Sequence, residues 1–364
     1  MIVGNLVHRP VRSLISIVAV ALEVTLILLI VGLSLGMLQD SRSRTAGIGA
    51  DVIVMPPGSS FIVGLTGAPM PIKVADKLAK LPHVEKVAPV VTQVTSAGTL
   101  EVIVGVDLAS YESLSGGFRY LKGGPFQEPN DAIVDDLFAQ SKHVKIGDTI
   151  EVLNNSFRVS GIVEHGKGGR KFLPLSTMQD LMGARDKASV IYLKLDNPAN
   201  ADTVVDEIKH IPGMERYVAT SMATYLSMMT PTNYPGLSTF IHVVIGISVV
   251  IGVLVIFQAM YTAVMERTRE IGILKSMGAS RLYIVNVVLR ETVLLAFGGI
   301  VLGVAFSLAA RAALAQKLPL LQVIVAGGWI VRATLIAIAS AVAGALYPAF
   351  KAAQKDPIDA LAYE

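Results

Sequence analysis

The sequence predicts an integral membrane α-helical protein with four transmembrane helices and a large extracytoplasmic α+β domain between helices 1 and 2. Three observations predict this class. The 364-residue chain is 52% hydrophobic and 16% charged, whereas an ordinary soluble domain is about a quarter charged. Four apolar runs are long enough to cross the roughly 30 Å hydrocarbon core of a bilayer. Between the first two runs, residues 39–237 are polar and punctuated by glycine and proline.

The first span is expected at residues 14–38, after a cytoplasmic N-terminal segment at residues 1–13. His8, Arg9 and Arg12 precede the span, and the positive-inside rule places such residues in the cytoplasm. The apolar run is too long for a cleavable signal peptide, and no small-residue cleavage site ends it cleanly. We therefore expect it to remain as a membrane anchor.

Residues 39–237 have the alternation of short strands and helices that is typical of an α+β domain. Strands are expected at 51–55, 83–93, 100–106 and 190–195, and helices at 72–81, 176–182 and 200–211. A hairpin is expected at 146–164, with its turn at Leu153-Asn154-Asn155. Asparagine suits the positive φ that such turns need. The domain should build its own core.

Three further spans are expected after this domain. The second, third and fourth lie at residues 238–264, 285–310 and 329–350. A cytoplasmic helix at 265–284 joins the second and third spans, a short outer loop at 311–328 joins the third and fourth, and a cytoplasmic tail occupies 351–364. Arg290 and Glu291 can pair at the inner interface, and Trp329 and Arg332 suit the outer one.

The charged segment Met265–Ser280 reads MERTREIGILKSMGAS. Glu266 with Arg269, and Arg267 with Glu270, stand three residues apart and can meet on a helix surface. Gly278 can end the helix in the left-handed conformation, and Ser280 can cap the next helix. One stripe of the helix holds Ile271, Leu274 and Gly278, and the neighbouring apolar stripe holds Ile273 and Met277. The remaining face is polar and carries Thr268, Arg269, Lys275 and Ser276.

This pattern has two interpretations. One is a rigid amphipathic helix, held between two spans, that contacts a soluble partner. The other is an ordinary solvated loop that anchors the two spans through its charge. Residue chemistry alone leaves both open.

Several kinds of chemistry are excluded. The net charge of +3 comes from scattered lysines and arginines, which argues against nucleic acid. The chain has no cysteine, so it lacks disulfides and zinc–thiolate sites. Gly161–Gly168 has the glycine spacing of a phosphate-binding loop, but Gly168 stands where serine or threonine would hold magnesium; we interpret it as a mobile basic loop. The histidines are dispersed, and we expect no catalytic, cofactor or metal residue on this chain.

Glu23 lies deep in the first span. A carboxylate there costs about 2.5–3.5 kcal/mol on insertion scales, so it needs a partner. One reading is a contact for a polar or cationic group of a substrate. The other is a hydrogen bond between helices, to a threonine, a serine or Gln258.

Met228, Met229 and His242 gather at the outer approach to the second span. They are candidates for an adaptable substrate surface or for haem iron or copper ligation. The alternative is a stalk that packs on the extension of the first span. Gly298, Gly299 and Gly303 indicate close helix packing, and Arg42 and Arg44 are interpreted as the exit of the first span into water.

Five stretches resemble the MacB/FtsX-type permease family of ABC transporters. ERTREIGILKSMGAS resembles the family's signature between its second and third spans, and YPAFKAAQKDPIDALAYE its closing pattern. VKIGDTIEV and FLPLSTMQDLM look like its extracytoplasmic domain, and NLVHRPVRSLISI like its opening. The likeness covers the whole chain in the right order.

The resemblance implies a homodimer in the cell (inner) membrane, with both termini cytoplasmic and ATP and Mg bound by a separate cytoplasmic ATPase. It makes the charged segment a coupling helix that docks on that ATPase, through Glu266, Arg267, Thr268, Arg269, Glu270, Ile271, Gly272, Leu274, Lys275, Met277 and Gly278. It implies export or extraction of a lipophilic or envelope-associated substrate by mechanotransmission, and it allows for a periplasmic adaptor. Alternatives are a signalling protein that activates a cell-wall hydrolase, and a membrane scaffold without an ATPase.

Overall fold

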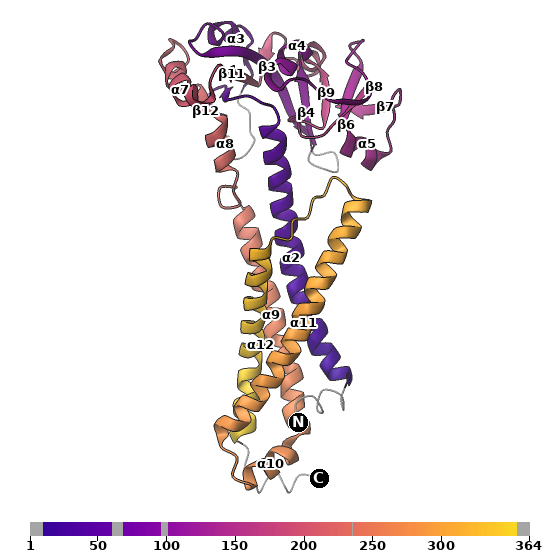
Figure 1. Cartoon of the computed structure of the whole chain (residues 1–364), viewed down its shortest axis with the longest axis vertical. Helices are drawn as coiled ribbons and strands as arrows, with labels where there is room; N and C mark the ends of the chain where they lie inside the picture. The colour runs from indigo at the N-terminus through magenta and orange to yellow at the C-terminus, as the bar shows by residue number, and fades with distance from the viewer. Residues whose placement is uncertain (1–9, 60–67, 96–100, 235, 355–364) are drawn as a thin grey trace. The chain divides into compact units, whose positions relative to one another are not determined.

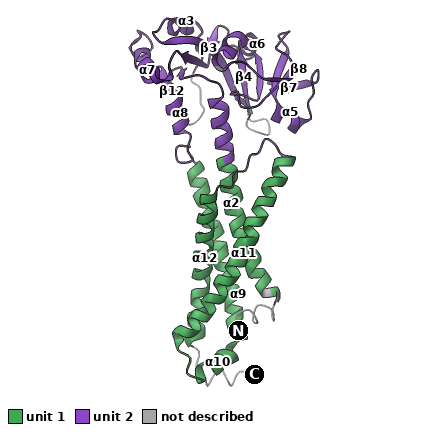
Figure 2. Ribbon diagram, in the orientation of Figure 1, with its two compact units in different colours: residues 1–35, 236–316, 323–364 green, residues 36–235, 317–322 purple. Residues whose placement is uncertain are grey.

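The computed structural model describes residues 10–59, 68–95, 101–234 and 236–354. The chain forms two compact units (Figure 2). The first comprises residues 1–35, 236–316 and 323–364, and we call it the helical bundle. The second comprises residues 36–235 and 317–322, and we call it the sheet domain.

Four long helices, side by side in Figure 1, make the bundle: α2 (Pro10–Ala46), α9 (Leu237–Glu266), α11 (Arg281–Lys317) and α12 (Gly327–Gln354). Each is long and apolar enough to cross a membrane. Two of these helices extend several residues beyond the predicted spans. The helix α2 continues through residues 39–46, and α11 takes in residues 311–317 of the predicted outer loop. Neither extension contains glycine or proline before its end, so nothing in them breaks a helix.

The helices α2 and α11 approach closely at two glycines. A Cβ added at Gly299 would lie 2.6 Å from the Cβ of Val20, and one at Gly303 would lie 2.7 Å from the carbonyl oxygen of Ala21. Thr25 Oγ1 donates to the Gly303 carbonyl at 3.2 Å. The close packing expected from these glycines is present. At Gly298 an added Cβ would meet its nearest neighbour only at 3.6 Å, so Gly298 does not take part.

The helices α9 and α12 pack through a stripe of small residues that the sequence analysis did not identify. Alanines recur every fourth residue on the buried face of α12: Ala333, Ala337, Ala341, Ala345 and Ala349. A Cβ at Gly344 would lie 2.6 Å from the carbonyl oxygen of Val253. Small side chains let two backbones approach in this way. Hydropathy, which predicts the spans, does not reveal this stripe, because it measures apolar content and not side-chain size.

The sheet domain is built on a ten-stranded mixed sheet in the order β12-β1-β11-β3-β4-β9-β6-β8-β5, with β7 paired to β8. Its strands are β1 (Val52–Met55), β3 (Val84–Thr95), β4 (Glu101–Val106), β5 (Tyr120–Gly123), β6 (Asp131–Asp135), β7 (Thr149–Val152), β8 (Asn155–Val163), β9 (Lys171–Pro174), β11 (Val190–Leu195) and β12 (Val218–Ser221). The pairs β4–β9 and β6–β8 are parallel. A separate small sheet pairs β2 (Met70–Pro71) with β10 (Lys187–Ala188).

Short helices cover this sheet. They are α3 (Lys73–Leu78), α4 (Leu108–Ser115), α5 (Asp136–Lys142), α6 (Leu175–Leu181), the 3-10 helix η1 (Pro198–Asn200), α7 (Ala201–His210) and α8 (Met222–Met228). Three buried apolar clusters form the core, centred on residues such as Phe172, Ile191 and Phe157. The domain therefore has its own core, as predicted.

The predicted hairpin is present as β7 and β8, with a shorter turn than expected. Val152 pairs with Asn155, so the turn holds two residues, Leu153 and Asn154, with φ of 50° and 60°. Positive φ at both positions is the conformation of a type I′ turn. Leu153 and Asn154 therefore make the turn as predicted, whereas Asn155 is the first residue of β8.

Candidate functional site: the charged segment and its attachments

The charged segment folds as a short helix between two sharp breaks. The helix α9 ends at Glu266, α10 (Thr268–Ser276) follows, and Gly278 has the predicted left-handed φ of 93°. Ser280 Oγ accepts from the Tyr283 amide at 3.2 Å and caps α11, as predicted. At the first break, the Thr268 hydroxyl donates to the carbonyls of Val264 and Met265, which satisfies groups that a helix end leaves open.

The faces of α10 differ partly from prediction. Thr268, Ile271 and Gly272 are buried, although Thr268 was expected on the polar face. Lys275, also expected there, donates from Nζ to the carbonyl oxygen of Ala353 at 3.0 Å. That carbonyl lies in the last turn of α12, where oxygens are unpaired and the helix dipole favours a cation. Lys275 therefore attaches α10 to the end of α12.

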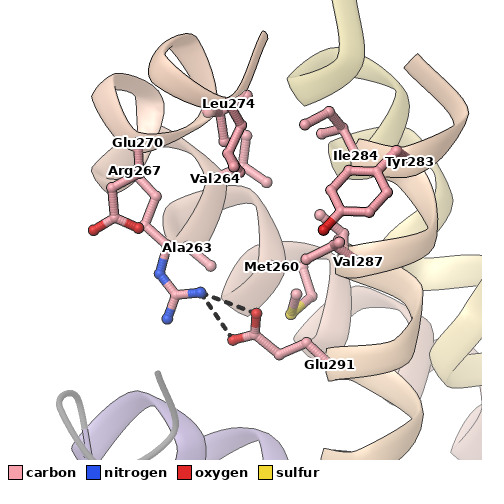
Figure 3. Close-up of a pocket in the computed structure, with 12 residues that line it drawn as sticks. Met260, Ala263, Val264, Arg267, Glu270, Leu274, Tyr283, Ile284, Val287 and Glu291 are labelled. Atoms are coloured by element: carbon pink, nitrogen blue, oxygen red, sulfur yellow. Dashed lines mark hydrogen bonds and ion pairs between the residues drawn. The ribbon is translucent and has the colours of Figure 1, made fainter. Parts of the chain in front are cut away.

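A buried ion pair attaches the other end of α10 to α11. Arg267 Nη1 lies 2.9 Å from Oε2 and 3.2 Å from Oε1 of Glu291 (Figure 3). The predicted pairing of Arg267 with Glu270 and of Glu291 with Arg290 is therefore wrong. Glu291 is only 4% exposed and points toward α9, whereas Arg290 is exposed. Glu291 shares its stripe with buried Ile284, Val288 and Leu295; this periodicity was the signal that could have placed it inward.

A small groove with a cavity volume of about 60 Å³ opens between α9, α10 and α11 (Figure 3). Most of its wall is apolar, and polar atoms come from Arg267, Glu291 and Tyr283. The apolar lining includes Met260, Val264, Ile271, Leu274, Ile284 and Val288. Elsewhere on the segment, the Ile273 side chain is 43% and the Met277 side chain is 74% exposed. The segment thus presents apolar side chains to its surroundings while its other face is fixed to the bundle.

Glu23 is buried among three helices of the bundle. It is 3% exposed, and the hydroxyl of Ser340 on α12 donates to its two oxygens at 2.9 and 3.0 Å. Gly252 on α9 makes room for the carboxylate, because a Cβ there would lie 2.1 Å from Glu23 Oε2. This arrangement matches the reading of Glu23 as a hydrogen-bonding residue between helices.

The other residues expected to contact substrate are divided between the two units. Met229 is buried and Met228 is exposed in the sheet domain. His242 belongs to the bundle, where its Nδ1 lies 2.6 Å from the Ser238 carbonyl of the preceding turn. Among the residues that the structure describes, no group of three or more histidine, cysteine, aspartate or glutamate side chains could hold a metal ion.

The loop at residues 164–170 holds the end of α2 within the sheet domain. The Gly168 amide donates to the Arg44 carbonyl at 2.8 Å, and Arg44 Nη1 donates to the Gly168 carbonyl at 3.3 Å. Gly47 packs so closely that a Cβ there would overlap the Gly166 carbonyl. The loop thus packs against the end of α2, and the Arg44 side chain is 14% exposed there, whereas Arg42 is exposed.

Four charged side chains continue this contact into the sheet, and we call them the arginine–aspartate ladder. Arg44 Nε donates to Asp40 Oδ2 at 3.0 Å, and Arg170 bridges Asp40 at 2.9 Å and Asp135 at 3.0 Å. Asp135 also caps α5 by accepting from the Phe138 amide at 2.7 Å. Burial raises the pKa of Asp135 to about 6, although the Arg170 guanidinium favours the ionised form.

Comparison with known proteins agrees with this architecture. A family model of the MacB-like periplasmic core domain matches residues 13–211, and one of the FtsX-like permease C-terminal region matches residues 242–357. The macrolide export ATP-binding/permease protein MacB of Shewanella sp. (strain W3-18-1) is 26% identical over 98% of this chain and 59% of its own length. Its namesake from Salmonella typhi is 26% identical over 97% and 58%. The chain thus spans about three-fifths of the length of these relatives.

Solved structures are also similar to part of the chain. The periplasmic region of MacB from Actinobacillus actinomycetemcomitans covers 50% of this chain and 94% of its own, at 16% identity and a TM-score of 0.39. The extracellular domain of the transporter YknZ from Gram-positive bacteria covers 47% and 98%, at 13% identity and a TM-score of 0.36. The two family models together span most of the sequence. The chain is therefore a multi-pass membrane protein that belongs to the MacB/FtsX-type permease family of ABC transporters.

Proposed function

We propose that the chain is the transport subunit of an ABC transporter and works as a homodimer coupled to a separate cytoplasmic ATPase. One observation carries this proposal. The helix α10 is attached to α11 through Arg267 and to α12 through Lys275, yet it leaves Ile273 and Met277 exposed. A helix that is fixed on one face, and that exposes apolar side chains beside the polar Arg269 and Glu270 on the other, suits force transfer from a partner.

The names of the relatives support an ATPase partner. They are called ATP-binding/permease proteins, and this chain matches about three-fifths of their length. Of the two matching family models, one describes the periplasmic core and the other the permease region. We infer that ATP and Mg bind to the ATPase and not to residues 1–364.

The proposed orientation follows from charge. Arg9 and Arg12 precede the first span, and such residues favour the cytoplasmic side. Four spans then return the C-terminus to the same side. On this proposal α10 and both termini are cytoplasmic in the cell (inner) membrane, and the sheet domain is extracytoplasmic.

Motion would reach the sheet domain through α2. This helix is continuous from Pro10 to Ala46. Its last turns are fixed to the loop at residues 164–170 and to the arginine–aspartate ladder. ATP-driven closure of the ATPase would move α10, and the bundle would pass that movement along α2. This route supports mechanotransmission, in which the sheet domain changes posture and the substrate need not cross the membrane.

The cargo we propose is lipophilic or associated with the cell envelope. The relatives are named for macrolide export, and macrolides are lipophilic. One of the matching family models is that of the periplasmic core domain. On this proposal, that domain is the part of the chain that contacts a substrate or a periplasmic adaptor.

Affinity purification of the tagged full chain from native membranes tests the proposal. Mass spectrometry should find a stoichiometric ATPase with a phosphate-binding loop motif. An accompanying adaptor would support export. If several mild detergents yield the chain without any ATPase, the transporter proposal is wrong and a membrane scaffold is the better description.

A further inference from the structure

A cluster of aromatic side chains surrounds a lysine where α9 and α12 run side by side (Figure 1). Lys351 Nζ lies 3.2 Å from the Tyr261 hydroxyl, 5.0 Å from the centre of the Tyr261 ring and 5.8 Å from that of Tyr347. Phe257 stacks on Tyr261 at 5.9 Å between ring centres and tilts against Tyr347 at 5.8 Å. The rings thus hold one another and fix the position of the ammonium group.

The hydrogen bond leaves donors for a further ligand. An ammonium group has only donors, so Lys351 donates and the Tyr261 oxygen accepts. The phenolic proton of Tyr261 is then available to an acceptor outside the cluster. Lys351 retains two further N–H donors. Donors from a cation and a neighbouring hydroxyl therefore converge, which is the chemistry that binds an oxyanion.

The charge of Lys351 is not matched by a carboxylate. In the part of the chain that the structure describes, its contacts are with the two tyrosines, and no aspartate or glutamate pairs with it. Arg267 and Lys275 at this end of the bundle are held differently, by the Glu291 carboxylate and by a backbone carbonyl. The charge of Lys351 is therefore open to an anion from outside these residues.

The surroundings restrict what that anion can be. Tyr347 is 56% and Phe350 is 52% exposed, beside the lysine on α12. Tyrosines on a spanning helix favour the boundary between hydrocarbon and headgroups, and lysine near a helix end extends its charge to that boundary. The ligand should therefore combine an oxyanion with an apolar portion that covers these rings.

We propose that Lys351, Tyr261 and Tyr347 bind the phosphate of an anionic phospholipid, whose acyl chains lie against Phe350 and the exposed face of α12. The lysine and the Tyr261 hydroxyl hold the phosphate oxygens, and the aromatic rings fix the lysine. The site does not depend on an ATPase partner and stands apart from the proposed function.

Native mass spectrometry of the full chain in mild detergent tests this site. The probes are phosphatidylglycerol and phosphatidylcholine, added in increasing amounts to wild type, Lys351→Gln, Lys351→Arg and Tyr261→Phe. Lys351→Gln should weaken phosphatidylglycerol binding about fivefold, the factor that one lysine contributes near an anionic lipid surface. Lys351→Arg should retain binding, and Tyr261→Phe should lose part of it. Phosphatidylcholine should bind more weakly than phosphatidylglycerol to wild type.

Arg332 provides a matched control on the same helix. Its guanidinium lies 4.9 Å over the Trp329 ring, so Arg332→Gln removes another cation held by an aromatic side chain. Equal losses in Arg332→Gln and Lys351→Gln would overturn the proposal, because any interfacial cation would then suffice. Unchanged binding in Lys351→Gln would also overturn it. Inorganic phosphate should not displace the lipid; displacement at millimolar phosphate would identify free phosphate as the ligand and refute the lipid. An equal unfolding temperature for each variant confirms that it is folded.

Discussion

Arg267 Nη1 lies 2.9 Å from Glu291 Oε2, and this pair joins the break before α10 to the body of α11. Both side chains are largely withdrawn from solvent. A buried pair resists the loss of either partner, because the remaining charge keeps its desolvation cost. The pair therefore fixes the direction in which α10 leaves the bundle.

Replacement of Arg267 by methionine should lower the stability of the bundle. It keeps an apolar stem but leaves the Glu291 carboxylate without the guanidinium, at a cost of about 3–5 kcal/mol for a broken buried pair. The thermal unfolding midpoint of the full chain in detergent measures the loss. Arg269→Met is the matched control, because Arg269 lies two residues further on, in α10, and is exposed. Equal midpoints for the two variants would show that the ion pair has no structural role.

Two adjacent glycines should respond differently to alanine. At Gly299 the new Cβ would lie 2.6 Å from the Val20 Cβ and 2.8 Å from the Ile17 carbonyl, and overpacking costs about 1–3 kcal/mol. At Gly298 the nearest atom is 3.6 Å away, so alanine there should be neutral or stabilise by up to about 1 kcal/mol. Unfolding midpoints of the two variants in the same detergent make the comparison. A Gly298→Ala variant that is the less stable of the two would contradict the packing of α2 on α11.

Gly252 and Glu23 should be energetically coupled. In Gly252→Ala the new Cβ would meet Glu23 Oε2 at 2.1 Å, so the carboxylate has to swing away from Ser340. Glu23→Ala removes the clash, and the double variant should regain about 0.5–3 kcal/mol relative to the sum of the single changes. A double-mutant cycle of unfolding free energies measures this term. Strict additivity would mean that the two residues do not meet.

Asp135 should make stability depend on pH between about 4 and 6. Burial raises its pKa from 3.8 to about 6, so in this window the folded protein binds a proton that the unfolded chain releases. The protonated Asp135 contributes its full stability below pH 4, and this contribution is lost as the pH rises through 6. At 1.36 kcal/mol per pKa unit, the loss in unfolding free energy reaches about 3 kcal/mol. Wild type should therefore lose stability across this window relative to Asp135→Asn, which keeps the α5 cap.

Unfolding midpoints recorded from pH 4 to 7 test this dependence. Parallel curves for wild type and Asp135→Asn would contradict the raised pKa. Arg170→Met supplies a second test, since the Arg170 guanidinium lies 3.0 Å from Asp135 and favours its ionised form. Its removal should move the window to higher pH, and a shift to lower pH would oppose the role of the ladder.

The sequence predicts the architecture well because its signals are local. Length and hydropathy identify the four spans, and period-two alternation identifies the β7–β8 hairpin. Gly278 and Ser280 mark the end of α10 and the start of α11 because their conformational and capping preferences need no distant partner.

The attachments of α10 were harder to predict, since they join residues far apart in the sequence. Pairs three residues apart favoured Arg267 with Glu270, yet Arg267 reaches Glu291 on another helix. Lys275 reaches Ala353 in the same way. Likewise, the loop at residues 164–170 looked mobile by its glycines alone. The close contact instead depends on Gly47, where a Cβ would overlap the Gly166 carbonyl.

The central claim is that the exposed face of α10 receives the ATPase, and one substitution tests it most directly. Met277→Glu places a charge on this face, where the side chain is 74% exposed. Met182→Glu is the matched control on the sheet domain, at another exposed methionine. Affinity purification from native membranes should recover the ATPase with wild type and with Met182→Glu, and lose it with Met277→Glu while the unfolding midpoint stays the same. Undiminished recovery of the ATPase with Met277→Glu would contradict the docking of α10.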